Sequence, residues 1–305
     1  MTMSRAVRGT VAGIAAAFIA VLPATIPSAV AAPNVPVLQS PKGTSLSLAS
    51  APNARDLGGY PTQGGGGKIK AGTVYRSDAL SKLSDAEQQQ LVSTGIVKII
   101  DFRSPTERGA NPDKVPASIP VQSLPVYDPA NDFYVFFGKA VQGGPEYQQQ
   151  VLGDGKGAQY MSDYYRWMVT DATSRGQFAT ALKEIANSSG PVMYHCTAGK
   201  DRTGWMTAIL MSALDVPKGQ IYNDYLESNQ NLAAGNQAIL DGLVASGKVT
   251  DRSLFEPVLG VDRAFLDASF DQVQQSYGSM DNFLSQGLGI DAATISALKS
   301  KLVGK

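Results

Sequence analysis

A single cysteine stands at the start of a short segment whose residue types suit phosphate chemistry. Five residues separate Cys196 from Arg202. The apolar segment 191–195 before the cysteine predicts a buried strand, and the apolar segment 203–214 predicts a helix buried on every side. A loop between such elements points backbone N–H groups and the positive end of the helix dipole toward one place, which favours binding of a phosphate-sized anion.

Each polar residue of the loop has a predicted role. The planar guanidinium of Arg202 can bind two equatorial oxygens of a phosphoryl group, which carry the charge that must be stabilised in transfer. Thr203 could donate a hydrogen bond to the sulfur and help it leave. Lys200 has two interpretations of equal weight: it meets a second phosphate of the substrate, or it is a solvated side chain or a partner for Asp201. The predicted phosphate-binding residues are Thr197, Ala198, Gly199, Lys200, Asp201, Arg202 and Thr203.

The same surroundings would make Cys196 a nucleophile, because helix amino termini and nearby cations stabilise a thiolate. The expected reaction is attack of sulfur on phosphorus, protonation of the leaving alkoxide or phenoxide by an acid, and hydrolysis of the phosphocysteine by water. His195 precedes the nucleophile on a strand and points to the opposite face, so it is expected to orient the loop rather than to transfer protons. A buried structural thiol is the simpler alternative, and the agreement of strand, loop and helix signals argues against it.

At this point the sequence resembles a known family. Residues 195–204 match the signature loop of the cysteine-dependent protein tyrosine phosphatases, and the portion 199–204 resembles a bacterial branch that includes secreted mycobacterial enzymes. The resemblance covers most of residues 50–303. It implies hydrolysis of phosphotyrosine, and several members of the branch also accept phosphoserine, phosphothreonine and phosphoinositides. Further matches lie at 53–59, 75–78, 100–104 with Glu107, 277–279 and 287–290.

Two aspartates are candidates for the catalytic general acid. Many tyrosine phosphatases place this acid on a loop that opens with Trp-Pro-Asp, and this chain has no such tripeptide. Asp201, inside the loop, is the first choice, because the resemblance to related bacterial enzymes implies a loop aspartate. Asp101, at the carboxyl end of the predicted core strand 96–102, is the second, with a salt bridge to Arg103 or Arg55 as its alternative role.

Four further charged residues are expected to form a buried ion network that supports the loop: Arg55, Asp56, Arg76 and Asp78.

Composition excludes several other functions. The 305 residues contain 26 Lys and Arg against 26 Asp and Glu, without a basic run, which argues against a nucleic-acid partner. One Cys and one His exclude an intrachain disulfide and a structural zinc site of Cys and His ligands, and we predict neither a metal nor another cofactor. A thiol-dependent reductase would need further cysteines. A non-catalytic phosphate-binding module would normally have lost Cys196 or Arg202, and a phytase-like inositol polyphosphate phosphatase would need a basic cluster.

The amino terminus has the pattern of a secretory signal peptide over residues 1–31, with Arg5 and Arg8 before an apolar stretch at 11–22 and cleavage near Ala31. The apolar stretch is shorter than the roughly 20 residues of a spanning helix, so no stable membrane insertion is expected after cleavage, although an uncleaved anchor is the alternative. Residues 32–50 have the composition of a flexible linker, and 51–305 are predicted to form the phosphatase domain. The predicted localisation is secreted, and the predicted partners are phosphorylated protein or phosphoinositide substrates.

Strands and helices alternate along this domain, which predicts an α/β fold with a central, mostly parallel sheet flanked by helices, phosphatase-like, with extra helices at the carboxyl end. Residues 138–157 contain six glycines and are predicted as a surface loop, or as a mobile flap. Strands are predicted at 73–76, 96–102, 119–124 and 191–195, and helices at 84–94, 158–169, 177–186, 203–214, 218–232, 234–246, 261–277 and 291–303.

Overall fold

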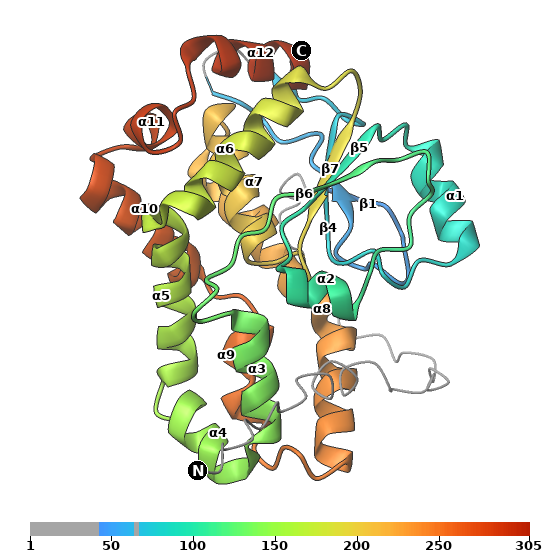
Figure 1. Ribbon diagram of the computed structural model, residues 1–305. Helices are drawn as coiled ribbons and strands as arrows, with labels where there is room; N and C mark the ends of the chain where they lie inside the picture. The colour runs from blue at the N-terminus through green and yellow to red at the C-terminus, as the bar shows by residue number, and fades with distance from the viewer. Residues whose placement is uncertain (1–42, 64–66) are drawn as a thin grey trace, which may run out of the picture.

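The computed structural model describes residues 43–63 and 67–305 (Figure 1). Its main sheet has six strands in the order β1-β2-β4-β7-β5-β6. The pairs β4 with β7, β7 with β5 and β5 with β6 are parallel, whereas β1 and β2 add antiparallel pairs at one edge. The bounds are β1 (Thr44–Ser45), β2 (Arg55–Asp56), β4 (Val74–Ser77), β5 (Lys98–Asp101), β6 (Val121–Ser123) and β7 (Val192–His195), with a separate antiparallel pair of β3 (Lys68–Ile69) and β8 (Val303–Gly304).

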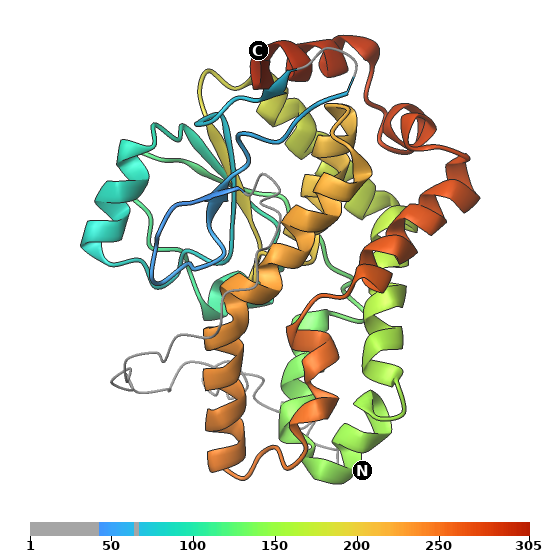
Figure 2. The ribbon, with the colours of Figure 1, turned by 180° about the vertical axis from the view of Figure 1, so that it is seen from behind.

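Helices cover both faces of the sheet and extend beyond it. In Figures 1 and 2, α1 lies on one side of the sheet and α6 and α7 on the other, while α3, α4, α5, α9 and part of α8 form a helical extension at the bottom of the view. The predicted α/β class with a mostly parallel sheet is thus confirmed. The helices are α1 (Asp85–Ser93), α2 (Pro105–Ala110), α3 (Phe133–Gln142), α4 (Gly144–Leu152), α5 (Lys156–Thr170), α6 (Ala172–Asn187), α7 (Arg202–Ala213), α8 (Lys218–Ala245), α9 (Glu256–Leu259), α10 (Arg263–Tyr277), α11 (Met280–Asn282) and α12 (Ala292–Leu302).

The central strands are buried on both faces, and their side chains alternate between two cores. From β7, Val192 and Tyr194 join the large core shared with α6 and α7, whereas Met193 joins a smaller core on the side of α1. A strand buried on both faces has a continuous apolar sequence rather than an alternating one. Cys196 directly follows β7, so it lies at the carboxyl ends of the parallel strands, and α7 begins six residues later.

Residues 138–157 do not form the predicted loop or flap; they belong to α3, α4 and α5. Four of the glycines lie at junctions between these helices, and two of them, Gly144 and Gly155, have φ values of +76° and +79°, which glycine adopts at little cost. The helices between the junctions bury Phe137, Val141 and Leu152 in the large core. The glycine content therefore reflects closely spaced helix ends.

Two other boundaries differ from prediction. Residues 218–245 form one continuous helix, α8, rather than two, and its sequence contains no residue that would break it at position 233. Residues 43–50 pack on the domain instead of forming the end of a linker: β1 pairs with β2, and Leu48 is buried in the smaller core. The predicted signal peptide and the rest of the predicted linker lie outside the described residues.

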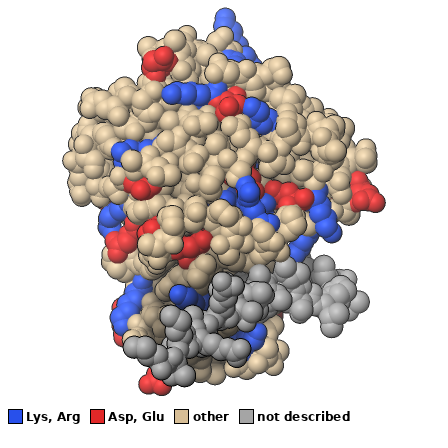
Figure 3. Space-filling view, viewed as in Figure 1, with Lys and Arg blue, Asp and Glu red and all other residues tan. Residues whose placement is uncertain are grey.

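Charged side chains of both signs are interspersed over the face in Figure 3, without a large area of one sign. None of the described helices combines the length and apolar character needed to cross a membrane.

The position of Leu48 gives a test of where the domain begins. Leu48→Ala should lower the free energy of unfolding by about 2–5 kcal/mol, because it removes a buried side chain and leaves a cavity. Val92→Ala in α1, whose side chain is 43% exposed, should change it by no more than about 0.5 kcal/mol. Equal effects of the two variants in urea unfolding would show that the segment around Leu48 is not part of the folded core.

Candidate active site

The loop between β7 and α7 passes very close to the end of β4. Gly199 has a φ of +65°, and a Cβ at this position would lie 2.4 Å from the Ser77 carbonyl oxygen and 2.6 Å from the Asp78 nitrogen. Both distances are far below van der Waals contact, and both neighbours are backbone atoms that cannot swing away. The loop therefore needs glycine at position 199. Cys196, at the start of the same loop, is almost fully buried, with 1% of its surface exposed.

Arg202 is fixed by a carboxylate from α2. Its two terminal nitrogens each donate a 2.7 Å hydrogen bond to Glu107, and one of them also donates to the Phe102 carbonyl oxygen at 3.3 Å. Thr197 in the loop donates to Glu107 at 2.6 Å. A guanidinium has five N–H donors, so three are used here and two remain for an anion in the loop. Glu107 thus links α2, the loop and α7.

Glu107 remains ionised in this setting. Burial raises the pKa of its carboxyl group, but the charge of Arg202 and the hydrogen bonds from Arg202, Thr197 and Ser104 lower it to about 2. Because the folded-state pKa lies below the ordinary value of 4.5, the stabilisation from this group is fully present above that pH and is lost as the pH falls toward 2.

The opposite side of the loop is held through its carbonyl groups. The Asn53 side-chain amide donates to the carbonyl oxygens of Ala198 and Gly199 at 3.0 and 3.1 Å, and Arg76 donates to the Gly199 carbonyl oxygen at 2.6 Å. Carbonyl groups bound from outside leave the loop N–H groups free to face inward, as an anion cradle requires.

Behind Asn53 and Arg76 lies a fully buried ion network centred on Asp224 of α8. Arg55 donates from Nε to Asp224 Oδ1 at 2.9 Å and from a terminal nitrogen to its carbonyl oxygen at 2.8 Å, and Arg76 pairs with Asp224 Oδ2. Burial alone would raise the pKa of Asp224, but the charges of Arg55 and Arg76 lower it below its ordinary value.

The expectation of an ion network is confirmed for Arg55 and Arg76 and is wrong for the two aspartates proposed with them. Asp56 accepts hydrogen bonds from the backbone of Gly58 and Gly72. Asp78 accepts one from the Asn53 backbone at 3.2 Å, and burial raises its pKa to about 7. Asp224 was missed, although a carboxylate between Ile221 and Tyr225 on the apolar face of a helix is a signal for a buried ion pair.

The two candidate acids have different surroundings. Asp201 lies in the loop and accepts hydrogen bonds from Tyr165 at 3.0 Å and from Lys200 Nζ at 3.0 Å. Lys200 also donates to the Gly260 carbonyl oxygen at 2.9 Å and is 3% exposed, so it is a partner of Asp201 and not a solvated side chain. Asp101, at the end of β5, accepts three hydrogen bonds from the side chain of Arg103 and one from its backbone N–H.

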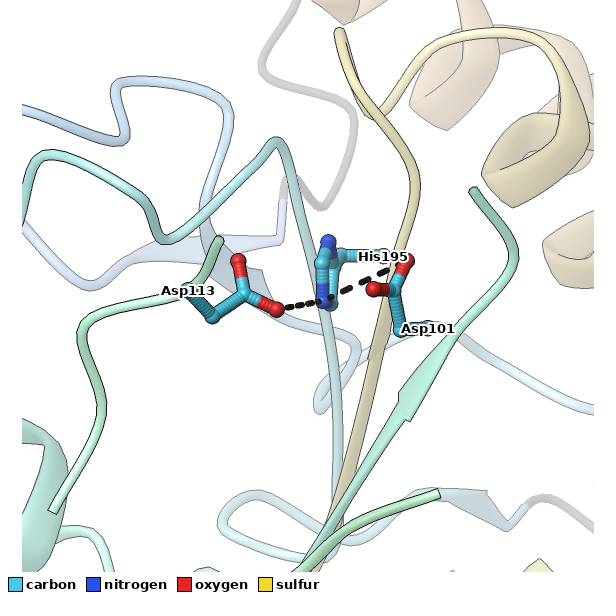
Figure 4. A group of neighbouring side chains, drawn as sticks. All are labelled: Asp101, Asp113 and His195. Atoms are coloured by element: carbon cyan, nitrogen blue, oxygen red, sulfur yellow. Dashed lines mark ion pairs between the residues drawn. The ribbon is translucent and has the colours of Figure 1, made fainter. Parts of the chain in front are cut away.

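Asp101 and His195 lie opposite each other in the pairing of β5 and β7, so both side chains point to one face of the sheet while Cys196 follows on the other side. Asp113, in the segment after α2, completes a cluster with them (Figure 4). Asp113 stands in an irregular segment without periodicity, so no sequence pattern pointed to it.

The donor atoms of Asp101, Asp113 and His195 all lie within 4.8 Å of one another, the spacing that a metal site would require. A terminal nitrogen of Arg103 already pairs with both carboxylates, at 2.8 and 2.7 Å. The guanidinium supplies the positive charge that a metal ion would otherwise provide, so we interpret the group as an ion-pair cluster. A surface pocket of about 470 Å³ opens beside it, lined by Asp101, Arg103, Pro105, Arg108, Gly109, Pro112, Asp113, Val115, Val121 and Ser123.

The network around Asp224 predicts a large stability effect. Asp224→Asn should lower the free energy of unfolding by about 3–5 kcal/mol, because it leaves the buried charges of Arg55 and Arg76 without their counter-ion. Asp241→Asn breaks an ion pair with Arg252 whose carboxylate is 53% exposed, and should cost at most about 1 kcal/mol. Denaturant unfolding of both variants measures the difference, and a small loss for Asp224→Asn would contradict the role of this network.

Comparisons with known proteins identify a family for most of the chain. Residues 46–304 match the model of the tyrosine phosphatase family. The chain is 30% identical to a tyrosine-protein phosphatase of Cupriavidus necator, over 86% of this chain and 91% of that protein. It is also 30% identical to the triple specificity protein phosphatase PtpB of Mycobacterium tuberculosis, over 84% of this chain and 98% of that protein.

A solved structure of P. aeruginosa TpbA in complex with pTyr is 16% identical over 68% of this chain and 90% of that chain, with a TM-score of 0.23, too low an overlap to support an argument. The family match and the two relatives confirm the resemblance seen in residues 195–204. The chain belongs to the tyrosine phosphatase family and is a phosphatase.

Proposed function

We propose that this enzyme hydrolyses phosphomonoesters through a phosphocysteine intermediate on Cys196. The observation that carries the proposal is the bidentate hold of Glu107 on Arg202, which leaves two guanidinium donors unused on a residue that begins α7 and whose charge interacts with Cys196. A fixed arginine fork and a helix amino terminus together stabilise the equatorial oxygens of a transferred phosphoryl group.

The proposed reaction has two steps. The Cys196 sulfur attacks phosphorus, and the ester oxygen departs with a proton from the general acid. Water then attacks the phosphocysteine and gives a proton to the carboxylate left on that acid, while the S–P bond breaks and releases phosphate and the thiolate. Thr203 Oγ1 is buried and has no hydrogen-bond partner within the described residues. We propose that this hydroxyl donates a hydrogen bond to the Cys196 sulfur when the sulfur leaves phosphorus in the second step.

We propose Asp201 as the general acid, with Asp101 in a structural role. Asp201 is in the loop that carries Cys196, and Tyr165 fixes it through a hydroxyl that itself accepts a 2.7 Å hydrogen bond from Tyr225. All four hydrogen bonds that Asp101 accepts from Arg103 would have to change before its carboxyl group could donate a proton elsewhere.

The proposed substrates are phosphotyrosine together with phosphoserine, phosphothreonine and phosphoinositides. The similarity to a relative named as a triple specificity phosphatase supports a range wider than phosphotyrosine. Lys200 Nζ contacts both carboxylate oxygens of Asp201 and the Gly260 carbonyl oxygen, which engages its three N–H donors. A second phosphate on an inositol ring could therefore reach Lys200 only by displacing one of these contacts. This constraint disfavours the phytase-like alternative, and the presence of both Cys196 and Arg202 disfavours a non-catalytic phosphate-binding module.

We also propose that the protein is secreted after cleavage near Ala31 and has no nucleic-acid partner. The first point rests on the signal-peptide pattern, and the second on the balanced charge of the chain.

Cys196→Ser tests the covalent mechanism. Turnover should fall by about 10⁴-fold or more, because the hydroxyl is a far weaker nucleophile. Binding of vanadate should persist, since Arg202 and backbone groups form the cradle. Arg202→Lys should, unlike Cys196→Ser, bind vanadate weakly, because lysine keeps the positive charge but lacks the planar guanidinium. Phosphate release and vanadate titration measure the two effects, and near-normal turnover of Cys196→Ser would exclude the phosphocysteine.

Asp201→Asn and Asp101→Asn separate the candidate acids. A general acid contributes about 10²- to 10⁴-fold only when the leaving group needs a proton. Asp201→Asn should therefore slow hydrolysis of an alkyl phosphate much more than that of an activated aryl phosphate, and should remove the basic limb of the pH profile. Asp101→Asn should lower both rates alike. A selective loss on the alkyl phosphate in Asp101→Asn alone would transfer the role to Asp101.

A further inference from the structure

The only histidine of the chain immediately precedes the proposed nucleophile and is fully buried. Its Nδ1 lies 3.1 Å from the carbonyl oxygen of Cys196. A carbonyl oxygen can only accept a hydrogen bond, so Nδ1 must carry a hydrogen. The imidazole of His195 thus contacts the backbone of Cys196, the proposed nucleophile.

The other ring nitrogen faces carboxylates. Nε2 lies 3.2 Å from Asp113 Oδ2 and 3.8 Å from Asp101 Oδ1, and it makes no well-aligned hydrogen bond in the described part of the chain. In a neutral imidazole with a hydrogen on Nδ1, Nε2 carries a lone pair. That lone pair would lie close to two anionic oxygens and be repelled by them. A hydrogen on both nitrogens removes this repulsion, and the ring is then an imidazolium.

A count of buried charge leads to the same protonation state. Asp101 and Asp113 contribute two negative charges and Arg103 one positive charge, so a neutral His195 would leave one buried negative charge unbalanced. Such a charge is costly in a protein interior. Burial alone would lower the pKa of His195, but Asp101 and Asp113 outweigh both burial and the opposing charge of Arg103, and raise it above 6.5. Asp78 is a further acid whose charge interacts with the ring.

Asp113 is itself firmly held. Its Oδ1 accepts a 3.1 Å hydrogen bond from the Leu80 backbone N–H, while its Oδ2 faces Arg103 at 2.7 Å and His195 at 3.2 Å. The Lys114 N–H donates in turn to the Leu80 carbonyl oxygen at 3.1 Å. These hydrogen bonds join the segment after α2 to the segment after β4. They hold the Asp113 carboxylate in one orientation relative to the His195 ring.

We propose that Asp113 is a positioning residue: it holds His195 as an imidazolium, which binds the Cys196 carbonyl group and keeps a positive charge next to the nucleophile loop. The catalytic consequence rests on the proposed role of Cys196, whereas the state of the histidine does not. The charge stabilises the Cys196 thiolate from the face of the sheet opposite to the substrate, and it adds to the contribution of the α7 amino terminus.

The composition of the chain makes this inference directly measurable, because one His and one Cys give signals without assignment. In the full folded chain, NMR titration of the imidazole should give a pKa above 6.5. Asp113→Asn should lower this pKa by about one unit or more, and Asp113→Glu should restore part of the shift. Asp281→Asn, an exposed aspartate on α11, is the matched control and should leave the pKa unchanged.

The second readout is the rate of alkylation of Cys196 by iodoacetamide as a function of pH. In Asp113→Asn the profile should move to higher pH, with roughly three- to tenfold slower alkylation at pH 6, because the charge beside the thiolate is lost. A merely structural role of Asp113 would lower the melting temperature without moving this profile.

The outcomes are separable. A wild-type His195 pKa at or below 6.5 would overturn the inference whether or not the variant folds. A lowered His195 pKa in Asp113→Asn with an unchanged alkylation profile would overturn the link to the nucleophile. If both readouts behave as expected but Cys196→Ser still turns over phosphate esters, the imidazolium stands and the phosphocysteine mechanism fails.

Discussion

The ion pair between Arg202 and Glu107 is the interaction on which the arrangement of this site depends. A flexible arginine would pay rotamer entropy each time it met a phosphoryl group, whereas a guanidinium already fixed by two parallel hydrogen bonds loses little more on binding. Glu107 also accepts from Thr197, so α2 fixes the guanidinium and the loop in one frame. The capping of α2 by Ser104 orients this carboxylate, because Glu107 bonds back to the Ser104 N–H.

Positive charge gathered around an anion site must itself be balanced when the site is empty. The structure balances it in two separate groups on the two sides of the loop. Asp224 lies between Arg55 and Arg76, and Arg76 reaches from there to the Gly199 carbonyl oxygen. On the other face of the sheet, Asp101 and Asp113 balance Arg103 and, in its proposed imidazolium form, His195. This second group sums to zero, whereas Asp224 with Arg55 and Arg76 retains one positive charge behind the loop, on the side from which Arg76 binds the Gly199 carbonyl oxygen.

The sequence predicted the parts of this site whose residues are adjacent along the chain. A strand, the Cys196 to Arg202 loop and a buried helix lie within residues 191–214, and their patterns agree. The counter-ions came from distant segments: Asp224 stands on a helix whose face could be recognised as apolar, and Asp113 stands in an irregular segment. Their pairing depends on tertiary contacts that local patterns do not encode. Residues 138–157 misled for a related reason, because glycine marks helix ends as readily as loops.

In the proposed mechanism the phosphoryl group is carried by Cys196 as a covalent intermediate. The most direct measurement is rapid acid quenching of the enzyme during turnover of an aryl phosphate, followed by mass spectrometry of the peptide that contains Cys196. We expect one added phosphoryl group on this peptide within the first turnover, attached to sulfur. Active enzyme that never carries the phosphoryl group on Cys196, or carries it on another residue, would contradict the account.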